Sequence, residues 1–443
     1  MKIQLSDNFT YGKLFRFAIP SVIMMIFTSI YGVVDGLFVS NIVGKEPFAA
    51  INLIMPILMI IGAFGFMMGA GGTAIVAKTL GEKDRESANK YFSMIVYITA
   101  IVGILMATLG LVFMRPLSEL LGARGNTLEY CVTYGRIVIA AMPFFMLQIL
   151  FQSFFIAAEK PKLGLGVTVA AGVTNIILDA LFVWMFEFGL AGAAVATSAS
   201  QAVGGIAPIF YFSKKNTSLL KLTRTRFFGK ILLKSITNGS SELMSNISSS
   251  IVTVLYNMQL MKFAEEDGVA AYGVIMYISF IFIAMFIGYS IGCAPIISYH
   301  YGAQNKNELK NILRKSTAIT FGAGFLMLAF GFFFSSPLAR IFVGYDSSLL
   351  EMTAKGLKIF SLSFLFSGFC IFASSFFTAL NNGPVSAAIS FLRTLVYQIV
   401  LVLLLPALFK LDGIWYSMLA AEILAFVTTL AFLFAKKKKY GYM

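Results

Sequence analysis

Two polar residues interrupt a long apolar stretch of the sequence. The stretch is TVAAGVTNIILDALFVWMF, residues 168–186, and the interruptions are Asn175 and Asp179. Because the two residues are four apart, a helix places both side chains on one face. A carboxyl group at this depth in a membrane costs about 3 kcal/mol, so it usually faces a cavity or a partner. Asp179 is therefore a candidate ion-binding or proton-binding group. The alternative is a neutral, hydrogen-bonded carboxyl that serves packing alone.

Three further polar residues are expected at a similar depth. Asp35 lies about five residues before the outer end of the first predicted span, Thr197 lies about eight residues into the sixth, and Gln148 lies in the fourth. With Asn175 and Asp179 they form an oxygen-rich set that suits a proton or a hard monovalent cation. Two carboxyls in an apolar pocket also disfavour simultaneous ionisation. We predict a coupling site for H+ or Na+ here, and no other cofactor.

The composition is that of a membrane protein with many spans. Of the 443 residues 58% are hydrophobic and only 12% are charged, against about 25% charged in soluble domains. Apolar runs of about twenty residues recur along the chain, which predicts an all-α polytopic membrane protein. We place twelve spans at 14–40, 50–77, 91–114, 130–157, 163–186, 189–212, 236–262, 269–297, 313–334, 356–380, 385–409 and 412–435.

The basic residues indicate how the chain is oriented. The formal net charge is +14, which by itself could suggest nucleic acid as a partner. On this span map, however, 24 of the 34 Lys and Arg fall on the side that holds both termini. Basic loops mark the cytoplasmic side of a membrane protein. We therefore expect both termini in the cytoplasm and no nucleic-acid partner.

The sequence contains an internal repeat. A shift of 221 residues superimposes residues 72–92 on 293–313 and pairs Gly81 with Gly302. Each half then has six spans, and an even number makes the two repeats parallel, an arrangement found in secondary transporters that rock about a central cavity. The predicted domains are an N-lobe of residues 1–212, a cytoplasmic linker of residues 213–235 and a C-lobe of residues 236–443.

The repeat shows that the polar set belongs to one half only. In the second half its four most deeply placed members are replaced by an aromatic and three apolar residues. If these polar groups served folding alone, we would expect some of them to survive the duplication. The pairs are Asp35 with Tyr256, Asn175 with Val396, Asp179 with Val400, and Thr197 with Met418.

The second half carries charged residues of its own. Glu242 lies near the start of the seventh span, Arg393 in the eleventh and Glu422 in the twelfth. Arg393 and Glu422 could form a structural ion pair. In the alternative interpretation, Arg393 and Glu242 line a substrate cavity.

The sequence offers no chemistry for an enzyme. It has no GxxxxGK[ST] motif for ATP, and its single histidine, His300, has no HExxH-type neighbour. We see no nucleophile–base pair and predict that the protein is not an enzyme. A scaffold would have no need of Asp35 and Asp179. Phe (45 residues) and Met (22 residues) are abundant, and a cavity walled by them would suit flat apolar cations.

Several stretches of the sequence are similar to one transporter family. They are SIYGVVDGLFVSNIVG in the first span, GEKDRESANKYF after the second, and NIILDALF around Asp179. Through them the chain resembles the multidrug and toxic compound extrusion (MATE) family over nearly its full length. The set Asp35, Asn175, Asp179 and Thr197 matches the N-lobe cation site of the DinF-like branch of that family. The phrase LNNGP resembles the branch of Gram-positive multidrug exporters.

This resemblance implies a fold and a function. The fold would be the MATE/MOP type, and the function would be export of cationic amphipathic compounds driven by H+ or Na+ across a bacterial plasma membrane. The chain would work as a monomer with small-molecule cations and membrane lipids as partners. The NorM-like branch carries a carboxylate in the tenth span, but residues 356–380 contain none. A flippase or exporter of a lipid-linked or other endogenous substrate is the alternative, with Arg393 as the one cationic candidate for a pyrophosphate group.

Overall fold

The computed structural model describes residues 3–442, apart from the side chains of residues 33, 34, 37, 38, 40, 41 and 45. The first half of the chain, up to residue 213, forms seven α-helices and two short π-helical segments. They are α1 (Tyr11–Phe38), η1 (Val39–Val43), α2 (Lys45–Gly81), α3 (Arg85–Leu120), α4 (Gly125–Ala140), α5 (Met142–Ala157), α6 (Pro161–Asp179), η2 (Ala180–Met185) and α7 (Gly189–Ser213).

The second half begins at residue 229 and has the same helical character. No strand occurs within residues 3–442, so the described chain is all-helical, as predicted. The elements are α8 (Gly229–Gly302), α9 (Lys306–Phe333), α10 (Ser335–Val343), α11 (Ser347–Ser361), α12 (Phe364–Ala379), α13 (Gly383–Phe391), η3 (Leu392–Val396) and α14 (Tyr397–Tyr440).

These helices account for twelve membrane crossings between residues 3 and 442. The 74 residues of α8 would extend about 110 Å as one helix, far more than the ~30 Å core of a bilayer. The backbone breaks at Glu265, where φ is 51°, and α14 breaks in the same way at Lys410. The pairs α4–α5 and α11–α12 bend by 54° and 49°, and each pair makes one crossing. The predicted number of spans is therefore correct.

The helices are longer than the predicted spans, and the turns between them are short. Only three residues separate α2 from α3, and the side chain of Asp84 accepts a hydrogen bond from the Ser87 amide at 3.0 Å. Hydrogen bonds from Ser87 hold the pKa of Asp84 below its usual range. The equivalent turn before α9 is capped by Asn305. Because α8 starts at Gly229, residues 229–235 of the predicted linker are helical.

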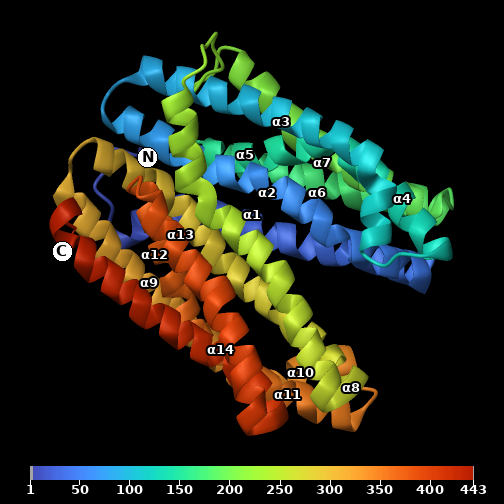
Figure 1. The fold of residues 1–443 in the computed structure, drawn as a ribbon. Coiled ribbons are helices and arrows are strands. Elements are labelled where there is room, and N and C mark those ends of the chain that lie inside the picture. The colour runs from blue at the N-terminus through green and yellow to red at the C-terminus, as the bar shows by residue number, and fades with distance from the viewer. Residues whose placement is uncertain (1–2, 443) are drawn as a thin grey trace.

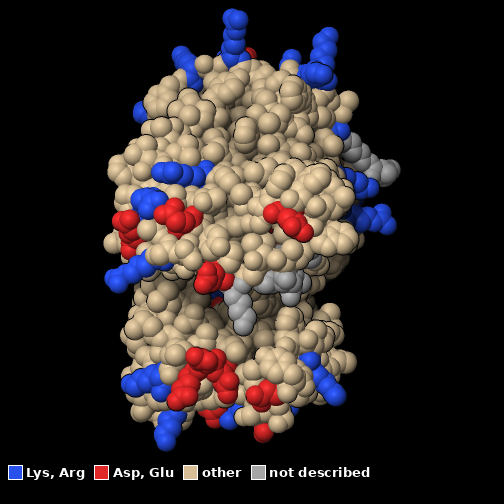
Figure 2. Space-filling model, turned by 90° about the vertical axis from the view of Figure 1, so that its right-hand side faces the viewer, with Lys and Arg blue, Asp and Glu red and all other residues tan. Residues whose placement is uncertain are grey.

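The two halves lie side by side and are closest at one end (Figure 1). Both termini lie at this end, which we call the termini end. At the other end, the far end, the ribbons of the two halves diverge toward α4 on one side and α10 and α11 on the other. Seen from the far end, acidic and basic side chains stand out on a largely uncharged surface (Figure 2).

The contacts between the halves repeat with the period of the sequence. At the termini end Gly81 of α2 lies against the carbonyl of Tyr299, and Gly302 lies against the carbonyl of Lys78. The shift of 221 residues turns each of these contacts into the other. The two halves are therefore parallel repeats that meet about a pseudo-twofold axis.

Candidate functional site

The site in the first half depends on the close packing of α1 and α6. A side chain at Gly172 of α6 would collide with the ring of Phe27 and crowd that of Tyr31, both on α1, so glycine favours the close approach of the two helices. Asn175 and Asp179 follow within two turns of Gly172, and the approach therefore places them beside α1.

Two carboxyl groups meet between these helices. Asp35 of α1 and Asp179 of α6 are close enough for their carboxyls to interact, and Asn175 lies within reach of Asp35. Asp179 is fully buried and Asn175 is 2% exposed, whereas Asp35 is half-buried. Three of the residues singled out in the sequence thus meet in one place.

Two neighbouring helices complete the cluster through tyrosine side chains. Tyr134 of α4 lies close to Asp35, to Asp179 and to the side chain of Thr197 on α7. Tyr31 of α1 lies between Asp35 and the amide of Gln148 on α5. All five predicted coupling residues, Asp35, Asn175, Asp179, Thr197 and Gln148, are therefore near one another. Together with Tyr31 and Tyr134 we call them the polar cluster.

The polar cluster contains an unusual number of buried polar atoms without hydrogen-bond partners. A buried polar group left unpaired costs about 1–3 kcal/mol, so a fold tolerates several in one place when they serve a ligand. Most of the orphaned atoms are oxygens, which fits a proton or a monovalent cation. They are Oδ1 of Asp35, both carboxyl oxygens of Asp179, Nδ2 of Asn175, Oγ1 of Thr197, the hydroxyl of Tyr134 and, one turn beyond Thr197, Oε1 of Gln201.

Three residues at or next to this site were missed in the sequence. Tyr31 lies four residues before Asp35, and Gln201 lies four residues after Thr197, so the helical period could have indicated both. Tyr134 lies on α4, and no residue close to it along the chain had been singled out. Only the packing of α4 against α7 shows that Tyr134 lies beside the two carboxyls.

The helices that carry the carboxyls change to π-helical geometry at the site. The segment η2 begins directly after Asp179, and η1 begins four residues after Asp35. A third segment, η3, contains Arg393. Short π-helical turns inside α-helices are frequent at functional sites.

At the equivalent place in the second half, the side chains pack and hydrogen-bond with one another. The hydroxyl of Tyr256, which replaces Asp35, donates to Oε1 of Gln398 at 2.9 Å. The amide of Gln398 in turn donates to the sulfur of Met418, which replaces Thr197. The ring of Tyr256 stacks on Tyr272 with a centroid distance of 5.1 Å. This half holds no counterpart of the polar cluster at that place.

The other charged residues of the second half lie apart from the polar cluster. Arg393 binds Glu422 with an N–O distance of 2.8 Å, and Glu422 is 1% exposed. The ion pair that the sequence left open is therefore formed. Among the described residues no ion pair involves Glu242, which is half-buried on α8.

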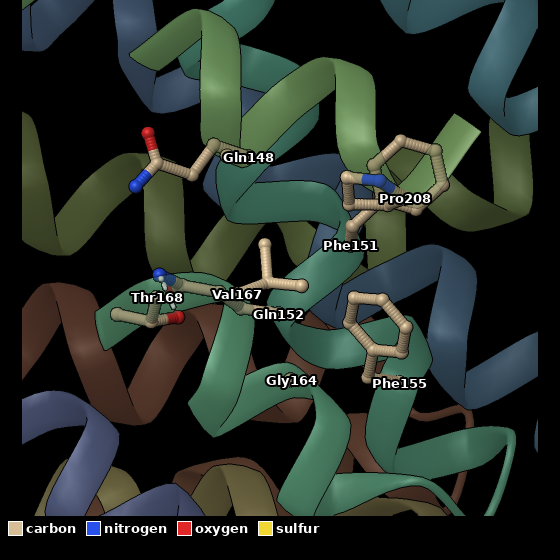
Figure 3. A pocket seen from close by; sticks show the side chains of 9 residues that line it. Gln148, Phe151, Gln152, Phe155, Gly164, Val167, Thr168 and Pro208 are labelled. Carbon is tan, nitrogen blue, oxygen red and sulfur yellow. Dashed lines mark hydrogen bonds between the residues drawn. The ribbon is translucent and has the colours of Figure 1, made fainter. Parts of the chain in front are cut away.

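A narrow crevice lies next to the polar cluster, between α5, α6 and α7 (Figure 3). Gln148 lies at one end of it, and its amide projects away from the ring of Pro208. Gln152 donates to the hydroxyl of Thr168 at 3.4 Å. The rest of the lining is apolar or glycine: Phe151, Phe155, Gly164, Val167 and Gly204.

Comparison with known families shows to which family the chain belongs. A family model described as MatE matches residues 20–181 and again residues 243–404. The chain belongs to the MatE family. The two matches have equal length and fall one in each half, in agreement with the repeat. As a MatE protein the chain is a membrane transporter and not an enzyme.

Curated relatives and solved structures agree with the MatE assignment. The chain is 25% identical over 422 residues to the multidrug export protein MepA of Staphylococcus haemolyticus (strain JCSC1435), covering 94% of this chain and 91% of the relative. MepA of Staphylococcus aureus (strain MRSA252) is 24% identical with the same coverage. A structure of an outward-facing multidrug resistance MATE transporter of the MOP superfamily superimposes with a TM-score of 0.93 at 22% identity, covering 100% of this chain and 99% of that chain. A MOP superfamily transporter from Pyrococcus furiosus gives 0.89 at 23% identity and 97% coverage of both chains. The fold of this MatE protein is thus the MOP type.

Proposed function

We propose that this MatE protein is an antiporter that exports cationic amphipathic compounds in exchange for H+ or Na+. Relatives that match 94% of the chain are named multidrug export proteins, which supports a drug-like substrate. The observation that carries the coupling part is the pair Asp35 and Asp179, two carboxyls within the membrane region that lie close enough to interact.

The polar cluster would work as the ion side of the exchange. A proton or Na+ that enters from the far end would bind Asp35 and Asp179, with Asn175 and Thr197 as further ligands. One charge that crosses a potential of 100 mV supplies about 2.3 kcal/mol. Because two adjacent carboxylates repel each other until an ion binds, ion entry would change how α1 packs on α6 and so favour release of substrate.

The substrate would occupy the space between the halves. In this proposal residues 1–212 are the N-lobe, 213–235 the linker and 236–443 the C-lobe, and the two lobes rock against each other. The separate family matches at 20–181 and 243–404 support this division. Glu242 is the candidate for cation contact from the C-lobe, since the carboxylate of Glu422 is already paired with Arg393.

We also propose a location and an orientation. The protein would be a monomer in the bacterial plasma membrane with both termini in the cytoplasm. On the predicted span map 24 of the 34 Lys and Arg fall on the side that holds both termini, which supports this orientation.

Transport of a fluorescent lipophilic cation into inside-out vesicles tests the proposal. We expect uptake when a proton gradient or a Na+ gradient alone is imposed, and none in vesicles without the protein. The gradient that works identifies the coupling ion. Absence of uptake of every tested cation under both gradients would refute the proposed function.

A further inference from the structure

The residues before α1 form an ordered segment that touches both halves of the molecule. Residues 3–10 contain no helix, yet Leu5 and Phe9 are almost completely buried. Both residues belong to an apolar cluster at the termini end that consists mainly of second-half residues and also includes Ile156 of α5. The segment is therefore a packed part of the structure. We call residues 3–10 the strap.

One side of the strap is fixed to the second half. The amide of Phe9 donates to Glu308 of α9 at 2.8 Å, and its carbonyl accepts from Asn311 at 3.0 Å and from Lys315 at 2.6 Å. The ring of Phe9 packs edge-on against His300 of α8 with a centroid distance of 6.3 Å.

The other side of the strap is fixed to the first half. The amide of Leu5 donates to Oε1 of Glu159 at 2.8 Å. Glu159 lies in the turn between α5 and α6, where its backbone has a φ of 58°, and it is 9% exposed. Four residues of chain thus join a buried carboxylate of the first half to one of the second half.

The linker makes the reciprocal contact. It leads into α8 of the second half, but it docks on α3 of the first half, which is the repeat counterpart of α9. The amide of Lys221 donates to Asn89 at 2.8 Å, and that of Thr223 donates to Ser93 at 2.8 Å. Each segment that enters a half therefore binds the third span of the other half.

We propose that the strap is a latch that holds the termini end of the two halves together. The inference rests on the proposed alternating exposure, because only then must this end open. Three hydrogen bonds of Phe9 hold the strap to the second half, and the bond from Leu5 to Glu159 holds it to the first half. Because both halves hold the strap, its contact with one half must break when the termini end opens, and the contact between Leu5 and Glu159 is the one that the experiment removes.

The distance between spin labels across the termini end tests the latch without any transport. Glu86 and Asn307 are exposed repeat counterparts at the starts of α3 and α9, and the native cysteines are buried, so cysteines at these two positions can be labelled selectively. We expect mostly short distances in the otherwise unchanged protein. Leu5→Ala and Glu159→Ala should each increase the long-distance population at least threefold. Glu159→Gln keeps an acceptor oxygen for the Leu5 amide and should increase this population less than Glu159→Ala does.

Gln4→Ala serves as the control, because Gln4 is an exposed strap residue with no part in the latch. If Leu5→Ala fails to fold, the Glu159 variants decide the question alone. Unchanged distances in folded Glu159→Ala would overturn the latch, even if cation export is confirmed. Shifted distances in a protein that exports no cation would support the latch and contradict the proposed function instead.

Discussion

At the scale of single residues, the two halves satisfy their buried polar atoms differently. In the second half Tyr256, Gln398 and Met418 satisfy one another. In the first half neither carboxyl oxygen of Asp179 has a hydrogen-bond partner among the described residues. Polar groups that already hydrogen-bond with one another gain little free energy from a ligand. A buried carboxyl without a hydrogen-bond partner gains the free energy of each interaction that the ligand makes with it. This contrast supports the proposal that the first half binds the coupling ion.

The ion pair of Arg393 and Glu422 leads to a prediction about stability. The side chain of Arg393 is only 13% exposed, so Glu422→Gln leaves a largely buried guanidinium without its partner, which should cost about 3–5 kcal/mol of unfolding free energy. The double change Arg393→Met with Glu422→Leu should recover most of this loss. Denaturant unfolding in detergent measures both.

The exposed pair of Lys355 and Asp412 provides the control for this prediction. Its side chains are 58% and 40% exposed, so Asp412→Asn should change the stability by less than about 1 kcal/mol. Wild-type stability of Glu422→Gln together with lost export would show that the ion pair serves transport and not folding.

The members of the site were predictable from the sequence only where they interrupt apolar spans. Asp35 and Asp179 stand out because a charge within a span is rare, and the repeat showed that both belong to one half. Tyr134 could not be found in this way, since a tyrosine in a span is ordinary. Its position near the carboxyls depends on how α4 packs against α7.

At the scale of the helices, glycines set the distance between the halves at the termini end. Gly81 and Gly302 each lie against a backbone carbonyl of the other half, which has no flexible end to move away. Gly81→Ala and Gly302→Ala should therefore each cost about 1–3 kcal/mol of stability through overpacking. Thermal unfolding in detergent checks this prediction.

Two other helical glycines provide matched controls. A side chain at Gly166 of α6 or at Gly273 of α8 would meet no atom within 4 Å. Because alanine favours helix by about 1 kcal/mol over glycine, these two substitutions should be neutral or stabilising. Equal stability of all four variants would contradict the tight seam between the halves.

The number and order of the spans followed from hydropathy and from the repeat, but the irregular parts of the helices did not. Residues 130–157 read as one apolar run, and the bend near Ala141 appears only in the structure. The strap was also unpredictable. Its sequence is polar, and its two buried residues contact partners that are about 150 and 300 positions away along the chain.

At the scale of the whole molecule, orientation in the membrane is the next prediction. A fluorescent reporter that matures only in the cytoplasm should be active when it is fused to the C-terminus. The same reporter inserted in the far-end turn at residues 344–346 should be inactive. The opposite pattern would invert the proposed topology and the direction of transport.

The central claim is that the carboxyl pair in the first half couples ion entry to export. Asp179→Asn tests it most directly, because the amide keeps the shape and loses the charge. In liposomes with an imposed proton or Na+ gradient, we expect this variant to bind the fluorescent cation normally and to transport it at least tenfold more slowly than the unchanged protein. Val400→Asn, at the repeat counterpart, should transport at the normal rate. Near-normal gradient-driven transport by folded Asp179→Asn would contradict the account and leave Asp179 as a packing residue.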